Sequence, residues 1–393
     1  MHIIVNLQPL LSPLTGIGYY TRELTRELLH QDAPSVQGVT GRKLEILTQE
    51  HPLLQTTQVA GQPVTERDQW AWQLARRYLR NPLTRKMYRW LCAQRLRYNI
   101  EHPEAIYWEP NYVLLPWKGR SVVTVHDLSH QRYPEHHPAE RVQFLNRHLA
   151  SSLFRATRIN VVSQFTANEL QALHGVAPER IDIVPPAVAE RFFQPLTDTE
   201  AADLRRHYQL PPRYLLSVGT LEPRKNLATV LEAFASLPFA QQQKAPLLLA
   251  GMQGWGSQTY SEAVQHAFSR GTIRRLGYVA TEDLPGLYAL AQGFVYVSLY
   301  EGFGMPVVEA MAAGTPVLTA NTTATTEVAA GAAREVDPLD QDAIRTGLIQ
   351  LVEDRHDAYI AAGKKRAQQF TWQRSGELLL ASMQRAASEP TPA

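Results

Sequence analysis

The chain has 393 residues, of which 44% are hydrophobic and 19% are charged, and its formal net charge is +2 at pH 7. A chain of this length is too long for one ordinary hydrophobic core, so we expect two domains of similar size. The nearly neutral charge excludes a global field that attracts nucleic acid, and the single cysteine, Cys92, excludes an intrachain disulfide and a cysteine-rich metal site.

The first eight residues form a short apolar run that Asn6 and Gln8 interrupt, without a basic leader. This pattern predicts a first β-strand and not a signal peptide. No apolar run in the sequence approaches the length that spans a bilayer. We therefore expect a protein that stays on the cytoplasmic side.

Short apolar runs recur along the chain and alternate with stretches of helical periodicity. They cover residues 3–7, 44–47, 105–108, 121–125, 159–163 and 181–184 in the first half, and residues 214–218, 247–250, 273–276, 294–297, 316–319 and 333–336 in the second. Runs of this kind predict parallel strands covered by helices on both faces. We expect an α/β fold with two doubly wound, Rossmann-like domains that face each other across a ligand cleft.

A break in periodicity between Pro185-Pro186 and Pro211-Pro212 predicts the domain boundary. We place the first domain at residues 1–190 and the second at 191–370. Residues 371–393 then form a last helix and a short tail, and we expect the tail from residue 388 to be disordered.

The loop after the first strand, residues 12–20, opens a helix. Its Gly16-Ile17-Gly18 begins like a dinucleotide-binding fingerprint, but Thr21 stands where the third glycine belongs. On its own, this partial motif is weak evidence for a ligand.

Basic and aromatic residues are concentrated between Arg67 and Arg97, where Asn81-Pro82 splits the segment into two predicted helices. The apolar faces of these helices can pack on the first domain and leave the arginines in solvent. Alternatively, the segment docks on an anionic membrane, where basic side chains bind lipid head groups and tryptophans and tyrosines anchor in the interface.

His126 and Asp127 follow the predicted strand that ends at Val125. Such a pair can be structural, with Asp127 capping a turn and His126 packed in the core. Its place at the carboxyl end of a strand also suits ligand contact. His136 and His137, further along, lack the spacing of a helical metal site, so we expect no metal there.

Arg224 and Lys225 follow the first strand of the second half and precede a helix that begins near Asn226. A helix start is a poor place for cations, because the helix dipole is positive there. A diphosphate explains the placement, since arginine offers a planar fork and lysine a compact charge to phosphate oxygens.

Glu301 and Glu309 stand on either side of a glycine loop, Gly302-Phe303-Gly304, between a strand and a helix start near Pro306. Free backbone N–H groups at such a helix start favour phosphate, whereas carboxylates accept hydrogen bonds from sugar hydroxyls. The combination suits a sugar nucleotide.

The run from Ser298 to Ala310 resembles the E-x7-E element of retaining glycosyltransferases of family 4, and residues 312–318 and 217–227 continue that resemblance over about the whole chain. The resemblance implies the two-domain GT-B fold, with residues 371–393 crossing back to the first domain. It also implies that Glu301 binds the donor sugar and Glu309 the ribose.

Further site residues are implied by the same resemblance. Arg224 and Lys225 would bind the departing diphosphate, which Gly16 approaches from the first domain. Backbone N–H groups of Phe303, Gly304 and Met305 would contact sugar or phosphate, and backbone around Val279 would frame the base. His126 and Asp127 would contact the transferred sugar or the acceptor.

The family branch that the motifs resemble is that of bacterial mannosyltransferases of surface-polysaccharide assembly. It implies a retaining transfer without metal or other cofactor, from GDP-mannose or a GDP-6-deoxyhexose such as GDP-rhamnose, to a lipid-linked saccharide. The alternatives are a UDP- or ADP-hexose donor, a sugar-nucleotide 2-epimerase, and a non-catalytic nucleotide-sugar binding protein. An epimerase would need catalytic acids in the first domain and lacks the paired glutamates.

Overall fold

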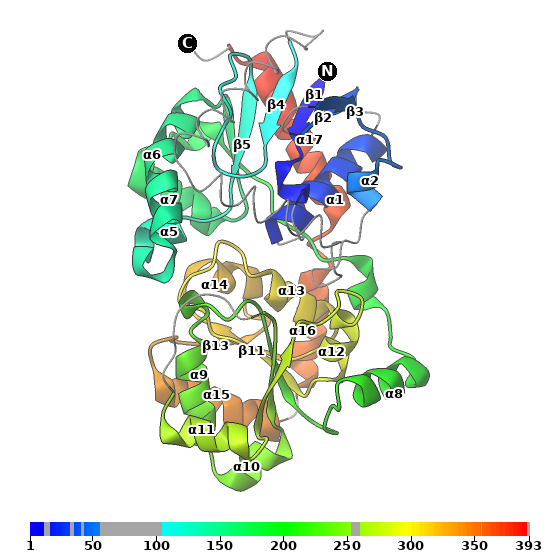
Figure 1. Cartoon of the computed structure of the whole chain (residues 1–393), viewed down its shortest axis with the longest axis vertical. Coiled ribbons are helices and arrows are strands. Elements are labelled where there is room, and N and C mark those ends of the chain that lie inside the picture. The colour runs from blue at the N-terminus through cyan, green and yellow to red at the C-terminus, as the bar shows by residue number, and fades with distance from the viewer. Residues whose placement is uncertain are drawn as a thin grey trace, which may run out of the picture.

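Two separate β-sheets organise the chain in the computed structural model, which describes residues 1–11, 16–31, 35–40, 43–55, 104–252, 260–354 and 356–390 (Figure 1). We call each sheet with the helices packed on it the first domain and the second domain. In Figure 1 they form the upper and the lower body.

The first sheet has seven strands in the order β3-β2-β1-β4-β5-β6-β7. Their bounds are β1 Ile3–Asn6, β2 Val36–Thr40, β3 Lys43–Ile46, β4 Ile106–Glu109, β5 Ser121–Val125, β6 Arg158–Val161 and β7 Ile181–Ile183. The second sheet has six parallel strands in the order β10-β9-β8-β11-β12-β13. They are β8 Leu215–Val218, β9 Leu247–Ala250, β10 Ile273–Gly277, β11 Gly293–Tyr296, β12 Val317–Ala320 and β13 Arg334–Val336.

Every predicted strand is confirmed, but the first sheet departs from the prediction at one edge. β2 was not predicted, and it pairs antiparallel with β3, so this sheet is not wholly parallel. The sequence of β2, Val-Gln-Gly-Val-Thr, has no continuous apolar run. The side chains of β3 are exposed or only partly buried, as an edge strand allows.

Helices cover both sheets. In the first domain they are α1 Gly16–His30, α2 Pro52–Gln55, α5 Ser129–Arg132, α6 Ala139–Arg155 and α7 Gln164–His174. The second domain carries α8 Asp198–His207, α9 Leu227–Ala235, α10 Phe239–Lys244, α11 Glu262–Ser269, α12 Leu284–Leu290, α13 Met305–Ala312, α14 Thr323–Ala329, α15 Gln341–Glu353 and α16 Asp357–Ala367. In Figure 1, α13 and α14 lie at the end of the second domain that faces the first.

The last helix, α17 Trp372–Ser388, returns to the first domain and packs against α1 and β6. Polar contacts to the buried Asp182 hold it there: the Ser382 hydroxyl lies 2.7 Å from Asp182, and the Arg385 guanidinium lies 2.7 Å from the same carboxylate. Arg158 pairs with Asp182 and, at 2.9 Å, with Glu389. Glu389, which the sequence analysis assigned to a disordered tail, is therefore anchored by an ion pair.

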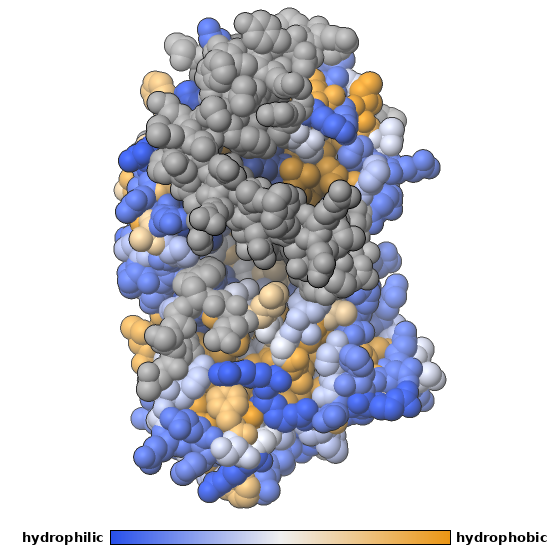
Figure 2. All heavy atoms as spheres, viewed as in Figure 1, coloured by the Kyte–Doolittle hydropathy of each residue, from blue (hydrophilic) through white to orange (hydrophobic). Residues whose placement is uncertain are grey.

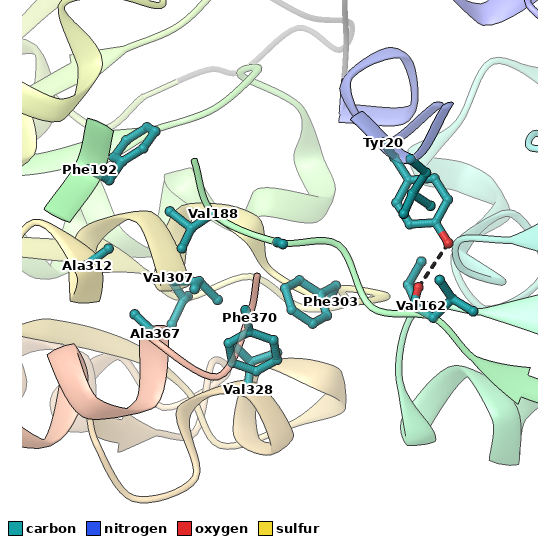
Figure 3. Packing of buried hydrophobic residues seen from close by; sticks show 14 of the residues in the cluster. Tyr20, Val162, Val188, Phe192, Phe303, Val307, Ala312, Val328, Ala367 and Phe370 are labelled. Carbon is teal, nitrogen blue, oxygen red and sulfur yellow. Dashed lines mark hydrogen bonds between the residues drawn. The ribbon is translucent and has the colours of Figure 1, made fainter. Parts of the chain in front are cut away.

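One buried apolar cluster extends from the first domain into the second (Figure 3). At its second-domain end, the Phe303 ring meets Phe370 edge-on, with centroids 5.3 Å apart. At its first-domain end, the Tyr20 hydroxyl donates to the Val184 carbonyl at 2.9 Å. Polar side chains dominate the outer rim of the second domain in Figure 2. The cluster fixes the glycine loop that contains Phe303 against both domains.

Two predictions concern membranes. Within the described ranges, no helix is long and apolar enough to cross a bilayer. The basic segment 67–97 lies outside the described residues, so its membrane docking stays a prediction.

Candidate functional site

Three strand ends bring the candidate residues together. β8 and β11 are neighbours in the second sheet, at the point where the strand order reverses, and ligands of such sheets bind there. The loop after β8 carries Arg224 and Lys225, and the loop after β11 carries Glu301. From the opposite domain, the end of β5 brings His126 and Asp127 to the same region.

Glu301 lies at the centre of this group, with its side chain 8% exposed. Its Oε2 accepts from Arg224 at 2.8 Å, and its Oε1 accepts from Lys225 at 2.6 Å. The Tyr296 hydroxyl donates to Oε1 at 2.8 Å and accepts from Lys225 at 2.5 Å. Arg224 also bonds Glu222 at 2.6 Å. The site therefore holds one carboxylate between two cations.

Two carboxyl groups here are strongly acidic. Burial alone would raise the pKa of Glu301, but Arg224 and Lys225 outweigh it and bring the pKa down to about 2. Burial would also raise the pKa of Asp127, but the charge of Arg224 and the hydrogen bonds from Ser129 outweigh it and bring the pKa down to about 2. Both groups are ionised at neutral pH, and the second owes part of its acidity to a cation of the other domain.

Glu309 lies apart from these cations, in the second turn of α13. Its Oε2 accepts from the Tyr288 hydroxyl at 3.0 Å. Burial raises the pKa of Glu309, and the Tyr288 hydrogen bond only partly offsets this. The two glutamates of the motif therefore lie in opposite electrostatic environments.

Each of the two loop positions, 302 and 304, requires glycine for a different structural reason. Gly304 precedes α13 with a φ of 105°, a conformation that disfavours side chains. At Gly302, an added Cβ would lie 1.9 Å from the His126 carbonyl oxygen. Only glycine allows the loop to pass this close to the first domain. Met305, not Pro306, is the first residue of the helix.

His126 and Asp127 make local contacts that agree with a structural role, in which Asp127 caps a turn and His126 packs in the core. The Nε2–H of His126 donates to the Pro110 carbonyl at 2.7 Å, which assigns this tautomer because a carbonyl only accepts. Burial lowers the pKa of His126, which favours a neutral ring. Asp127 accepts from the backbone N–H and hydroxyl of Ser129 at 3.1 and 2.8 Å. Both residues nevertheless lie at the end of β5 near the cationic group, since the charge of Arg224 acts on Asp127.

The remaining predicted residues lie around this centre. Gly16 begins α1, and a Cβ there would meet no described atom within 4 Å, so protein packing does not require a glycine. Val279 is buried just after β10. A cavity of about 20 Å³ beside Lys225 and Tyr296 is also lined by Gly219 and Leu221. Its volume suits about one water molecule.

Sequence reasoning missed Tyr296 and Tyr300. Tyr296 supplies the polar atom of the apolar strand β11, and a lone hydroxyl in such a run could have been recognised as a site group. Tyr300 is 2% exposed, and its hydroxyl contacts the first domain, which no local pattern indicates.

Metal ligands do not converge in the described part of the chain: no group of three or more His, Cys, Asp or Glu side chains is arranged to hold an ion.

Comparison with known proteins finds a glycosyltransferase family in each half of the chain. The family described as Glycosyltransferase Family 4 matches residues 14–191, and the family described as Glycosyl transferases group 1 matches residues 203–369. The O-antigen chain mannosyltransferase B of Escherichia coli is 36% identical over 381 residues, which cover 95% of this chain and 97% of that protein.

Solved structures share the fold at low identity. HepE of Anabaena, in complex with UDP-glucose, superposes with a TM-score of 0.70 at 17% identity over 98% of this chain and 99% of that one. WaaG, a glycosyltransferase involved in lipopolysaccharide biosynthesis, superposes with a TM-score of 0.65 at 16% identity over 97% and 98%. The GT-B architecture predicted from the sequence is thereby confirmed.

Proposed function

The chain belongs to family 4 of the glycosyltransferases, and from this premise we propose that it transfers mannose from GDP-mannose, or a related GDP-6-deoxyhexose, to a lipid-linked oligosaccharide in O-antigen biosynthesis. The similarity to an O-antigen chain mannosyltransferase over nearly the whole chain supports the sugar and the pathway. The GDP base rests on the motif resemblance alone.

One observation carries the proposed chemistry: the Glu301 carboxylate lies between Arg224 and Lys225 at adjacent strand ends. A carboxylate accepts hydrogen bonds from sugar hydroxyls, and the two cations stabilise the negative charge that develops on a departing diphosphate. Arg224 and Lys225 both lie within hydrogen-bond distance of Glu301, at 2.8 and 2.6 Å, so a donor that reaches the carboxylate also meets the cations.

We propose a retaining reaction without a covalent intermediate. The Glu301 carboxylate is bonded by two cations and a tyrosine hydroxyl, which makes it a weak nucleophile. The acceptor hydroxyl then attacks the anomeric carbon on the face from which the diphosphate departs. The carbon–oxygen bond to the diphosphate breaks, and the diphosphate takes the proton of the attacking hydroxyl.

Other residues complete the proposed donor site. Glu309 binds the ribose hydroxyls, and backbone N–H groups of Phe303, Gly304 and Met305 contact sugar or phosphate. Gly16 approaches the diphosphate from the first domain, and backbone at Val279 frames the base. His126 and Asp127 face the transferred sugar or the acceptor.

The test is a donor panel. The protein is incubated with GDP-mannose, GDP-rhamnose, UDP-glucose and ADP-glucose, with and without a lipid-linked oligosaccharide, and nucleotide release is measured. We expect release from a GDP-sugar that depends on the acceptor, an α-linked product by NMR, and full activity with a chelator.

Each alternative has its own outcome in this panel. Release from only UDP- or ADP-sugars refutes the base assignment, and loss of activity with the chelator refutes the metal-free mechanism. A C2-epimerised sugar without transfer identifies an epimerase. Donor binding without any turnover identifies a binding protein.

A further inference from the structure

Tyr300 lies directly before Glu301, yet its side chain is buried in the first domain. The Tyr300 hydroxyl accepts from the backbone N–H of Leu128 at 3.2 Å and donates to Glu169 Oε2 at 3.3 Å. Glu169 is held in turn by Arg132, through bonds of 2.8 and 2.6 Å. A second-domain loop thus completes a hydrogen-bond chain of the first domain.

Aromatic contacts fix the ring as well as the hydroxyl. The Tyr300 ring packs edge-on against Tyr133, at 5.9 Å between centroids, and against Phe165, at 5.4 Å. Edge-to-face pairs of this kind are worth about 0.5–1.5 kcal/mol beyond area burial. All of these partners belong to the first domain.

The residue after Glu301 is held by the same domain. The Gly302 carbonyl accepts from the hydroxyls of Ser163 and Thr166 at 2.6 and 3.3 Å. Both sequence neighbours of Glu301, Tyr300 and Gly302, therefore form hydrogen bonds with the first domain.

The backbone around Tyr300 also forms hydrogen bonds with Arg224, one of the two cations of the proposed donor site. Arg224 donates to the Tyr300 carbonyl at 2.7 Å as well as to the Glu301 carboxylate, and the Leu299 N–H donates to the Arg224 carbonyl at 3.0 Å. A shift of Tyr300 would therefore move the Glu301 carboxylate relative to the guanidinium.

We propose that Tyr300 is a positioning residue through which docking of the first domain sets the position of Glu301 for the donor sugar. The inference rests on the proposed function of Glu301. It means that the donor sugar is held for reaction only while the acceptor side of the enzyme is in place, whereas the nucleoside diphosphate is bound mainly by the second domain.

The test compares Tyr300→Phe with Tyr214→Phe, a matched loss of a buried hydroxyl that bonds the Leu287 carbonyl within the second domain. For Tyr300→Phe we expect turnover to fall by about tenfold, since small misplacements of reacting groups are costly, with a loss of melting temperature similar to that of Tyr214→Phe. The affinity for GDP should stay within about twofold, while the extra affinity that the sugar contributes, measured by calorimetry with GDP-mannose, falls. Tyr214→Phe should leave turnover and both affinities unchanged.

A double-mutant cycle separates positioning from general packing. Glu169→Ala removes the acceptor of the Tyr300 hydroxyl, and we expect its effect on turnover to be non-additive with that of Tyr300→Phe. Unchanged turnover and unchanged sugar-dependent affinity in Tyr300→Phe would overturn the inference, as would full additivity. Absence of transfer by the wild type would refute the proposed function instead, and the calorimetric comparison still decides the role of Tyr300.

Discussion

Glu301 and Glu309 are chemically identical residues on one loop and one helix, and the structure gives them opposite acid–base behaviour. Glu301 is paired with two cations and has a pKa of about 2, whereas burial raises the pKa of Glu309. An unfolded glutamate titrates near 4.3. The ionised form is therefore stabilised by folding at the first position and destabilised at the second.

This difference predicts opposite effects of the same substitution. The pairing of Glu301 stabilises the fold above the unfolded pKa, and this contribution is lost as the pH falls towards 2. Glu309 stabilises the fold only below the unfolded pKa and loses that contribution as the pH rises through its raised pKa. At pH 7, Glu301→Gln should lower the melting temperature and Glu309→Gln should raise it, each by about 2–4 °C. The Glu309→Gln effect should vanish near pH 4. Melting curves at both pH values test this, and shifts of the same sign at pH 7 would contradict it.

Lys225 should act mainly during the chemical step. Its charge matters most when the diphosphate leaves, so Lys225→Ala should lower kcat by about 10²-fold and change the donor KM much less. Steady-state kinetics with varied donor measure both constants. Lys244→Ala, which removes a surface lysine paired with Glu353, is the control. An unchanged kcat in Lys225→Ala would refute this role.

At the scale of elements, the N-terminus of α7 is completed from outside its own domain. The first backbone N–H groups of a helix have no partner within the helix. The N–H groups of Gln164 and Phe165 donate to the two carboxylate oxygens of Glu327, each at 2.9 Å, and the N–H of Thr166 donates to Ser163. Glu327 lies on α14 of the second domain, so a carboxylate of one domain caps a helix of the other.

Removing this cap should weaken the contact between domains. Because Glu327 is exposed and paired with a helix dipole, Glu327→Ala should destabilise the protein by at most about 1 kcal/mol at low salt, and by less at high salt. Denaturant unfolding at two ionic strengths measures this. Glu50→Ala removes an exposed carboxylate from the first domain and serves as the charge control. Equal salt dependence of the two variants would argue against the cap.

Local patterns predicted most strands, because short apolar runs between helices are a strong signal. Strand β2 escaped, because Gln37 and Gly38 interrupt its apolar residues. Within the site, the sequence indicated Glu301, Arg224 and Lys225 as separate motifs. Their mutual pairing depends on β8 and β11 being neighbours in the sheet, and the contact of Tyr300 depends on how the domains meet. Neither the strand order nor the contact between domains can be predicted from a local sequence pattern.

At the scale of the whole molecule, Asp182 joins the chain end to the first domain through Arg158 and Arg385. Burial opposes the ionised carboxylate, but the Arg158 hydrogen bonds outweigh it and lower the pKa of Asp182. Asp182→Asn leaves a buried guanidinium without its main partner and should destabilise the protein by about 3 kcal/mol at pH 7. The difference should shrink as the pH falls below the unfolded pKa of about 3.9, where the unfolded chain takes up a proton that the paired carboxylate of the folded protein does not yet bind. Urea unfolding at pH 7 and pH 3 tests this, and an equal difference at both pH values would contradict it.

The basic segment 67–97 predicts where the enzyme works. Each basic group near an anionic bilayer contributes about 1 kcal/mol, so we expect the protein to cosediment with anionic vesicles and to dissociate in salt. Replacing Arg76, Arg77, Arg80, Arg85 and Lys86 with Ser should abolish this binding and leave the melting temperature unchanged. Binding that ignores lipid charge and these substitutions would favour internal packing of the segment.

The hydroxyl of Ser163 has a consequence for the evolutionary history of this chain. One oxygen accepts from the Thr166 N–H at 3.1 Å and donates to the Gly302 carbonyl at 2.6 Å. Local helix formation and recognition of the other domain therefore share an atom and are subject to one selection pressure. Both partners are backbone atoms, and an added Cβ at Gly302 would clash with the His126 carbonyl, so only the side chain at position 163 can vary. We therefore expect relatives to keep a hydroxyl side chain at position 163.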